Sequence, residues 1–324
     1  VVKRYFDSVP SENDHIFNLF NKAYAEDGYL IYLPDDTKME RPIHVMNFID
    51  GNRPKPLVQY RNLIVAGKNT HADIINSYHS VLSDFSLTNA YTEAVLEENA
   101  RVNFHLFQGE GYDAAQLNKT VVKQEKSSVF KSNTATMCGT VVRNDLQIDF
   151  SDEFCDAQLS GFYLPARRQI TDNSVLIKHN YPNCTGMQFY RGIVEDHAKA
   201  VFTGKTFVAQ DAQNTDSEQS NRNILLSPDA RAYSRPQLEI YADDVACAHG
   251  STIGQIDKEA LFYLQTRGIS KRNAQTLLLN AFIAEVIEKG EIESFKQYIN
   301  YLLNKRLRGE DIASLCRVKP CPGC

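Results

Sequence analysis

Between residues 57 and 255 the hydrophobic positions form short runs that are rich in Val, Ile, Phe and Tyr. Gly, Asn, Asp and Pro punctuate these runs, which is the pattern of strands separated by turns. The clearest runs are Leu63 to Val65, Val102 to Phe107, Leu146 to Phe150, Phe189 to Val194, Lys205 to Val208 and Leu238 to Tyr241. Helical periodicity is almost absent here, so the pattern disfavours alternating strands and helices. It leaves a β-solenoid, a β-sandwich or a β-barrel.

A short motif recurs within this region, in which a turn-type or polar residue precedes Ala and a polar residue follows it. The Ala positions are 72, 100, 157, 198 and 230, with spacings of 28, 57, 41 and 32 residues. A small residue at each corner is typical of stacked solenoid rungs, although the uneven spacing also fits a sandwich. The polar run from Gln210 to Asn223 has two interpretations, side-chain ladders along stacked turns or an exposed loop.

After Asp257 the hydrophobic period changes from two to 3.6 residues, which predicts helices. A short helix is expected over Lys258 to Gln265, and Ser270 is a candidate cap for a second helix that ends near Gly290. The predicted buried face of the second helix is Ala274, Leu277, Leu278, Ala281 and Phe282. A third helix carries Ile292, Phe295, Ile299, Leu302 and Leu303 on one face. Such a small helical unit is expected to pack on the β region or to meet a partner.

At the amino end, residues Asp14 to Glu26 predict a helix with Ile16, Phe17, Phe20 and Ala23 along one side. The segment from Tyr29 to Pro34 then enters the β region. The chain begins with Val1 instead of Met, so it is open whether an amino-terminal helical domain is present only in part.

The composition disfavours nucleic-acid binding, a membrane-spanning protein and a secreted disulfide-rich protein. The 324 residues include 35 basic and 40 acidic side chains, a formal net charge of −5 that gives no general attraction to nucleic acid. No apolar run approaches the roughly 18 residues of a membrane helix, and no signal peptide is evident. The seven cysteines are odd in number and scattered, which is no disulfide framework, so we expect a cytoplasmic protein.

Two segments hold candidate metal ligands. In a strand, Cys247 and His249 would project to the same face, and both residue types bind iron and iron–sulfur clusters. The tail residues Cys316, Cys321 and Cys324 form a local thiol cluster whose simpler interpretation is a polar tail. No nucleophile elbow, zinc-protease motif or matched Cys-x-x-Cys pair is present.

The run from Gln188 to Ile269, which begins QFYRGIVEDHAKAVFTGKTF and includes ADDVACAHGSTIGQIDKEALFYLQTRGI, resembles the SufD branch of the SufB/SufD family. Members of that family are scaffold subunits for iron–sulfur cluster assembly. The SufB branch has a Glu on each side of the central His, whereas this chain has Ala248 and Gly250. Ala246 and Ala248 replace the Lys and Ser that the resemblance leads us to expect, and the Cys-containing tail is not a family feature.

The resemblance implies a mainly β protein, a right-handed parallel β-helix with a C-terminal α-helical domain and a short N-terminal helical remnant. The expected domains are a helical lead-in over 1–50, a β-helix core over 51–256, and a helical domain with the Cys-containing tail over 257–324. It also implies a non-catalytic scaffold that pairs with a SufB-like subunit and docks a SufC-like ATPase through its C-terminal helices.

The resemblance places His249, with Cys247 as a weaker candidate, where a nascent cluster forms at the interface with SufB. No cofactor is expected to stay bound to the isolated chain, because two ligands from one subunit cannot complete a tetrahedral iron site. Alone, the chain is expected to form a homodimer through exposed strand edges. The alternative function is a β-helix carbohydrate-active enzyme, a lyase or hydrolase that uses Asp243 and Asp244. A third possibility is a binding module in which His249 has no metal role.

Overall fold

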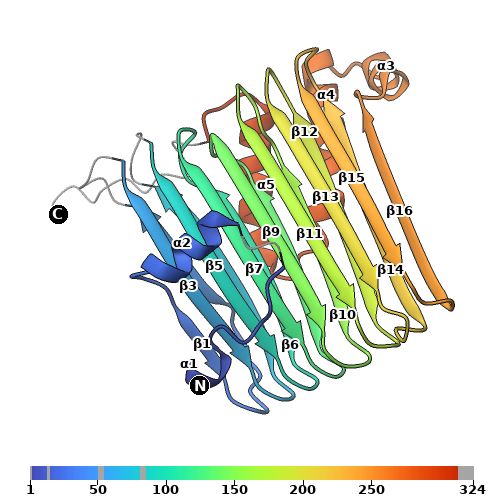
Figure 1. Cartoon of the computed structure of the whole chain (residues 1–324). Helices are drawn as coiled ribbons and strands as arrows, with labels where there is room; N and C mark the ends of the chain where they lie inside the picture. Colours follow the sequence, from blue (N-terminus) through green and yellow to red (C-terminus); the bar gives the residue numbers. More distant parts are fainter. Residues whose placement is uncertain (1, 13–14, 50–54, 81–84, 313–324) are drawn as a thin grey trace.

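The computed structural model describes residues 2–12, 15–49, 55–80 and 85–312. Within these residues the chain forms two parallel sheets of eight strands each (Figure 1). The first sheet contains β1 (Leu30–Leu33), β3 (Leu57–Ala66), β5 (Leu87–Leu96), β7 (Ala115–Gln124), β9 (Val141–Phe150), β11 (Ile170–His179), β13 (Lys199–Val208) and β15 (Arg231–Ile240). The second contains β2 (Ile43–Ile49), β4 (His71–Ser80), β6 (Arg101–Gly109), β8 (Val129–Thr136), β10 (Asp156–Tyr163), β12 (Thr185–Val194), β14 (Thr215–Leu225) and β16 (Val245–Gly254).

Odd strands belong to one sheet and even strands to the other, so each rung of the molecule contains one strand from each sheet. The number of residues between paired positions on neighbouring rungs varies little. The shortest step pairs Ala115 with Val141 and the longest pairs Leu30 with Leu63. This arrangement is a parallel β-helix, so the fold prediction is confirmed. Strands β1 and β2 already belong to the two sheets, ahead of the expected start of the β-helix at residue 51.

The recurring Ala motif marks the corners of the rungs. All five of its Ala residues are fully buried, namely Ala72, Ala100, Ala157, Ala198 and Ala230. Just before two of these corners the backbone adopts positive φ values, 55° at Asn69 and 59° at Asn99, a conformation that Asn tolerates. The Asn99 side chain donates to Oδ1 of Asn69 at 3.2 Å, so consecutive corners also stack through hydrogen bonds. A small corner residue is therefore required by close packing of neighbouring rungs.

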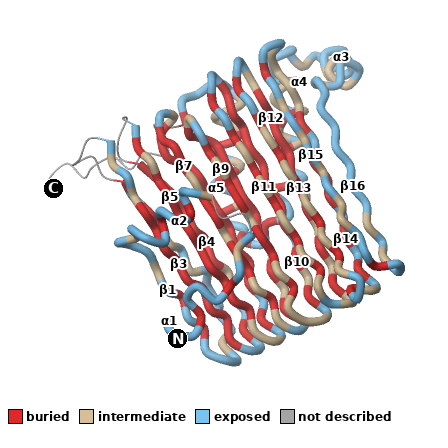
Figure 2. The backbone as a smooth tube through the Cα atoms, viewed as in Figure 1, coloured by how far each residue is buried: buried red, intermediate tan, exposed pale blue. Residues whose placement is uncertain are grey.

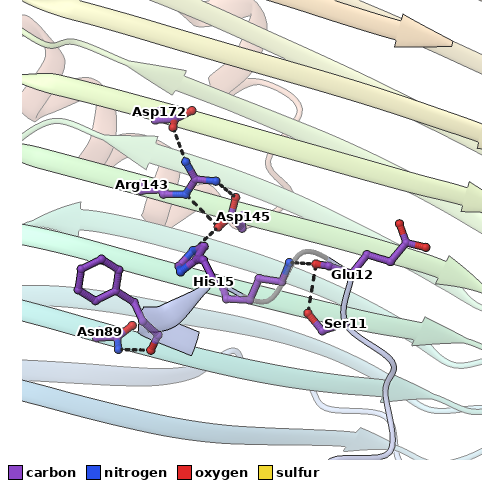
Figure 3. A network of polar contacts seen from close by, with 9 residues as sticks. Ser11, Glu12, His15, Asn89, Arg143, Asp145 and Asp172 are labelled. Atoms are coloured by element: carbon purple, nitrogen blue, oxygen red, sulfur yellow. Dashed lines mark hydrogen bonds and ion pairs between the residues drawn. The ribbon is translucent and has the colours of Figure 1, made fainter. Parts of the chain in front are cut away.

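The amino-terminal residues 2–12 and 15–24, here called the strap, cross the outer face of the first sheet (Figures 1 and 3). The strap contains α1 (Val2–Tyr5) and α2 (Ile16–Tyr24). Its first part buries Tyr5 and Val9 in an apolar cluster with residues of β3, β5 and β7. Its later part is held by polar contacts: His15 Nε2 lies 3.1 Å from Asp145 Oδ2, and the backbone amide of Glu12 donates to Gln147 at 2.8 Å. Arg143 bridges Asp145 to Asp172, which ties the contact to the next rung.

Helix α2 confirms the predicted amino-terminal helix, but its apolar side faces solvent. Ile16 is 75% exposed, and Phe17 and Phe20 are also exposed. The side that meets the sheet carries Asn21, which is fully buried and donates to the backbone oxygens of Tyr60 (3.0 Å) and Asn89 (2.8 Å). These two hydrogen bonds fix the orientation of the helix.

Three C-terminal helices follow the β-helix: α3 (Lys258–Thr266), α4 (Lys271–Ile287) and α5 (Glu293–Leu307). Helices α4 and α5 lie against the outer face of the second sheet, behind the strands in Figure 1. The predicted buried face of α5 is confirmed, and Ser270 caps α4 by accepting from the amide of Asn273. None of the helices in the described residues is long and apolar enough to cross a membrane.

The predicted buried face of α4 is only partly confirmed: Ala274 is buried and Phe282 packs against the apolar cluster, but Leu277 and Ala281 are exposed. Leu277 is half exposed, and the buried residues are Ala274, Leu279, Ile283, Val286 and Ile287. Apolar residues occur on nearly every side of this helix, so periodicity alone does not select the face that packs. The shape of the second sheet and the neighbouring α5 make that selection.

Candidate functional site

The candidate site lies at the carboxyl-terminal end of the β-helix, on its last rung. Strands β15 and β16 end the strand order of their sheets, so each has one edge without a strand neighbour among the described residues. Most of β16 is exposed, and Figure 2 shows it largely in pale blue. Such an edge presents unpaired backbone N–H and C=O groups that can pair with another strand.

The structure places both predicted ligands in β16, on the row of side chains that faces the β-helix interior. Cys247 is paired with Ser217 and His249 with Gln219, and both partners are buried in the interior. Because alternate residues of a strand share a face, the two candidates project side by side. Cys247 is half-buried and His249 is exposed, so the pair is open to the end of the molecule.

The environment of Cys247 favours the thiol over the thiolate. Its side chain packs against a small apolar cluster formed by Val208, Ala212 and Ala242. Burial raises the pKa of the Cys247 thiol, and the nearby Asp216 carboxylate raises it further. Binding of a metal ion to this sulfur would therefore have to displace a proton.

Polar side chains fill the interior next to the site. The run from Gln210 to Asn223 includes strand β14, whose alternate residues Thr215, Ser217, Gln219, Asn221 and Asn223 are buried. Gln219 donates to Thr206 Oγ1 at 2.8 Å, and Thr206 contacts Ser217 at 3.2 Å. This part of the run is therefore a strand with a polar interior row, and not an exposed loop.

Side-chain ladders occur in the same run at the corner, where Asn214 donates to Asn183 Oδ1 at 3.2 Å. In the part of the chain that the structure describes, no group of three or more His, Cys, Asp or Glu side chains could hold a metal ion. Cys247 and His249 would therefore need donors from elsewhere to enclose one.

The other candidate residues lie apart from a common site. Asp243 and Asp244 occupy an exposed bend before β16, where the Asp244 amide donates to Gln213 at 2.8 Å. The thiols of Cys155 and Cys184 are buried in adjacent rungs, and both contact the backbone oxygen of Asp152, at 3.2 and 3.5 Å. Cys138 is also buried. The tail residues Cys316, Cys321 and Cys324 lie outside the described residues.

One residue that positions the C-terminal helices was missed by the sequence patterns. Arg191 is almost fully buried on the outer face of β12, and its guanidinium lies 3.1 Å from the Glu285 carboxylate of α4. The guanidinium also sits 3.8 Å from the centre of the Phe189 ring and donates to Ser220. Burial lowers the pKa of Arg191, and Glu285 partly offsets this effect. A charged residue within an otherwise β-type run was the available signal.

Comparisons with known proteins identify the family of this chain. The family model of the SUF system FeS cluster assembly, SufBD core domain, matches residues 48–282, and the SufBD protein N-terminal region matches residues 1–45. The chain therefore belongs to the SufBD family.

Two curated relatives have similar identity to the chain. An iron–sulfur cluster assembly SufBD family protein of Synechocystis is 31% identical over 88% of this chain and 65% of its own length. The iron–sulfur cluster assembly protein SufD of Escherichia coli is 30% identical over 94% of this chain and 71% of its own length. The chain thus spans about two thirds of the length of these relatives.

Proposed function

We propose that the chain is a non-catalytic scaffold subunit for iron–sulfur cluster assembly that pairs through its last rung with a SufB-like subunit. The observation that carries this proposal is the open end of the β-helix, where β15 and β16 each have a free edge among the described residues. An added strand on each edge would continue both sheets across the interface, as in other cases of β-augmentation. The family membership and the names of the SufD relatives support the same role.

The pairing would bring donors of the partner to Cys247 and His249. Both residues lie on the interior row of the last rung, and His249 is exposed toward the open end. A tetrahedral iron site needs four donors, so this pair supplies at most half of them. The cluster is cargo that forms transiently in the complex, and no cofactor stays bound to the isolated chain.

The test is cluster formation on the anaerobically reconstituted complex. We expect His249→Ala to lower the amount of assembled cluster at least about tenfold, because one donor is lost from an incomplete set. The matched control is His197→Ala, which removes an exposed imidazole from a turn between β12 and β13. Equal assembly by both variants would contradict a role of His249 and would leave only a scaffold without a metal role.

The helices α3 to α5 are the proposed docking site of a SufC-like ATPase. Helix α3 has no buried residue, and its Phe262 and Tyr263 are 68% and 57% exposed. We expect Phe262→Asp to abolish co-purification with the ATPase, because aromatic side chains at interfaces often contribute a large share of the binding energy. Lys126→Asp, on an exposed turn of the β-helix, is the control. Full co-purification of the Phe262 variant would place the docking site elsewhere.

When the chain is alone, the same open end would pair two copies in a homodimer. The edges of β15 and β16 are then free in both copies. A two-fold arrangement would pair the unpaired backbone N–H and C=O groups of these edges with those of the second copy. A monomeric mass in light scattering at high protein concentration would contradict this assignment. The cytoplasmic location stays a prediction from the scattered thiols.

A further inference from the structure

A cavity of about 660 Å³ lies where the C-terminal helices meet the β-helix. Part of its lining is apolar and includes Ile193 of β12, Leu226 after β14, and Leu279 of α4. A volume of this size falls within the range of pockets that bind small molecules. The cavity lies away from the last-rung pair Cys247 and His249, neither of which lines it.

The charged side chains of this cavity are mostly positive. Lys258 lies at the start of α3, Lys271 and Arg272 in the first turn of α4, and Arg306 in the last turn of α5. Against these four cations the lining contains one carboxylate, that of Glu195. A hollow with like charges and apolar walls concentrates the electrostatic potential, so the cavity attracts anions.

Arg306 retains capacity to bind a further group. Its side chain is mostly buried, and its Nε has no hydrogen-bond partner among the described residues. Its guanidinium is 3.8 Å from the Glu195 carboxylate, which is longer than a direct hydrogen bond. A buried N–H without an acceptor is costly. Nε has almost no accessible surface, so an anion in the cavity would contact the other N–H groups of this guanidinium, which belongs to the cavity lining.

We propose that this cationic cavity binds a small organic phosphate, a phosphate ester whose apolar or aromatic body lies against the apolar wall. Lys and Arg side chains recognise phosphate through charge-assisted hydrogen bonds. A bare anion would use the four cations but would leave the wall of Ile193, Leu226 and Leu279 in contact with water. A neutral apolar molecule would use the wall but not the charges. An ester that joins both parts uses the whole cavity.

The first experiment compares three probes on the intact chain: naphthyl phosphate, inorganic phosphate and naphthol. The chain has no Trp, so naphthyl fluorescence can be followed without overlap from indole. We expect naphthyl phosphate to bind at least about tenfold more tightly than either fragment, because it combines the charged and apolar contacts. Its affinity should fall as the salt concentration rises.

The second experiment changes the charge of the lining. Lys258→Gln with Lys271→Gln should weaken binding of naphthyl phosphate about tenfold. Both side chains are exposed, so the double variant is expected to fold. Lys126→Gln with Lys199→Gln removes two exposed cations outside the cavity and should leave the affinity unchanged. Glu195→Gln removes the single carboxylate and should tighten binding, an effect that loss of structure would not produce.

Several results would overturn the proposal. Naphthyl phosphate could fail to bind at millimolar concentration, or could bind no better than its two fragments. The control pair could weaken binding as much as the pair in the cavity, which would show a general charge effect. Unchanged or weaker binding of naphthyl phosphate by the Glu195 variant would also contradict binding in the cavity. Circular dichroism and thermal melting of each variant would confirm that the compared proteins are folded.

Discussion

The helices on the two outer faces of the β-helix, α2 on the first sheet and α4 with α5 on the second, pack in opposite ways. On the second sheet, α4 and α5 pack with Leu302, Leu303 and Ile299 fully buried in a continuous apolar cluster. On the first sheet, α2 of the strap buries Asn21 and leaves Ile16 exposed. The contrast teaches that an amphipathic helix beside a sheet need not turn its apolar side inward. Buried backbone oxygens on the sheet can attract the polar side instead.

Removal of an apolar side chain from α5 should give the largest effect. We expect Leu302→Ala to lower the free energy of unfolding by about 4 kcal/mol, because the fully buried side chain leaves a cavity. Urea denaturation followed by circular dichroism measures the change. Leu277→Ala on α4 is the control, since this side chain is half exposed and should cost about 0.5 kcal/mol or less. Equal costs would show that the helices are not held by their buried face.

Acid should weaken the helical covering through His105. This residue is buried against the Phe295 ring, and burial lowers its pKa to about 4. The unfolded chain binds the proton more tightly than the folded one, so stability present above pH 6.5 is lost as the pH falls toward 4. The loss is about 2 to 3 kcal/mol. His105→Leu should make this part of the pH profile shallower in urea denaturation, and exposed His197→Leu should not. Buried His179, whose pKa burial lowers to about 3, would keep part of the slope. An unchanged profile in His105→Leu would contradict the assignment.

On the strap, the polar residue should matter more than the apolar one. Asn21→Ala should cost about 1 to 2 kcal/mol, because two buried backbone oxygens lose their donor. Leu19→Ala removes a larger apolar group that is 55% exposed and should cost about 0.5 kcal/mol or less. Faster proteolysis of the strap in Asn21→Ala alone would support this order. The reverse order would mean that α2 packs through its apolar side.

The sequence patterns predicted the strands, the C-terminal helices and the buried face of α5, and they offered β-helix corners as one of two interpretations of the Ala motif. The family resemblance selected the β-helix. The patterns succeeded where spacing and side-chain size are enough, as with Ala72 and its counterparts at the corners. They predicted only part of the packing face of α4 and did not predict the orientation of α2, because both depend on the neighbouring surface. For the site, alternation within one strand predicted that Cys247 and His249 share a face. The charge of Arg191 within a β-type run was a signal, but its partner Glu285 is distant in sequence, so local spacing did not identify the contact.

The alternation of strands between two sheets makes the molecule a one-dimensional stack. Each inner rung is held by hydrogen bonds on both sides, but β16 is held only by β14 among the described strands. In such a stack, cooperative unfolding starts as fraying from the ends, and amide hydrogen exchange is fastest there. Cys247 and His249 thus belong to one of the two terminal rungs, where local protection is expected to be lowest. A partner that extends both sheets would turn this frayed terminus into an interior rung, and binding and ordering of the site would be one thermodynamic event.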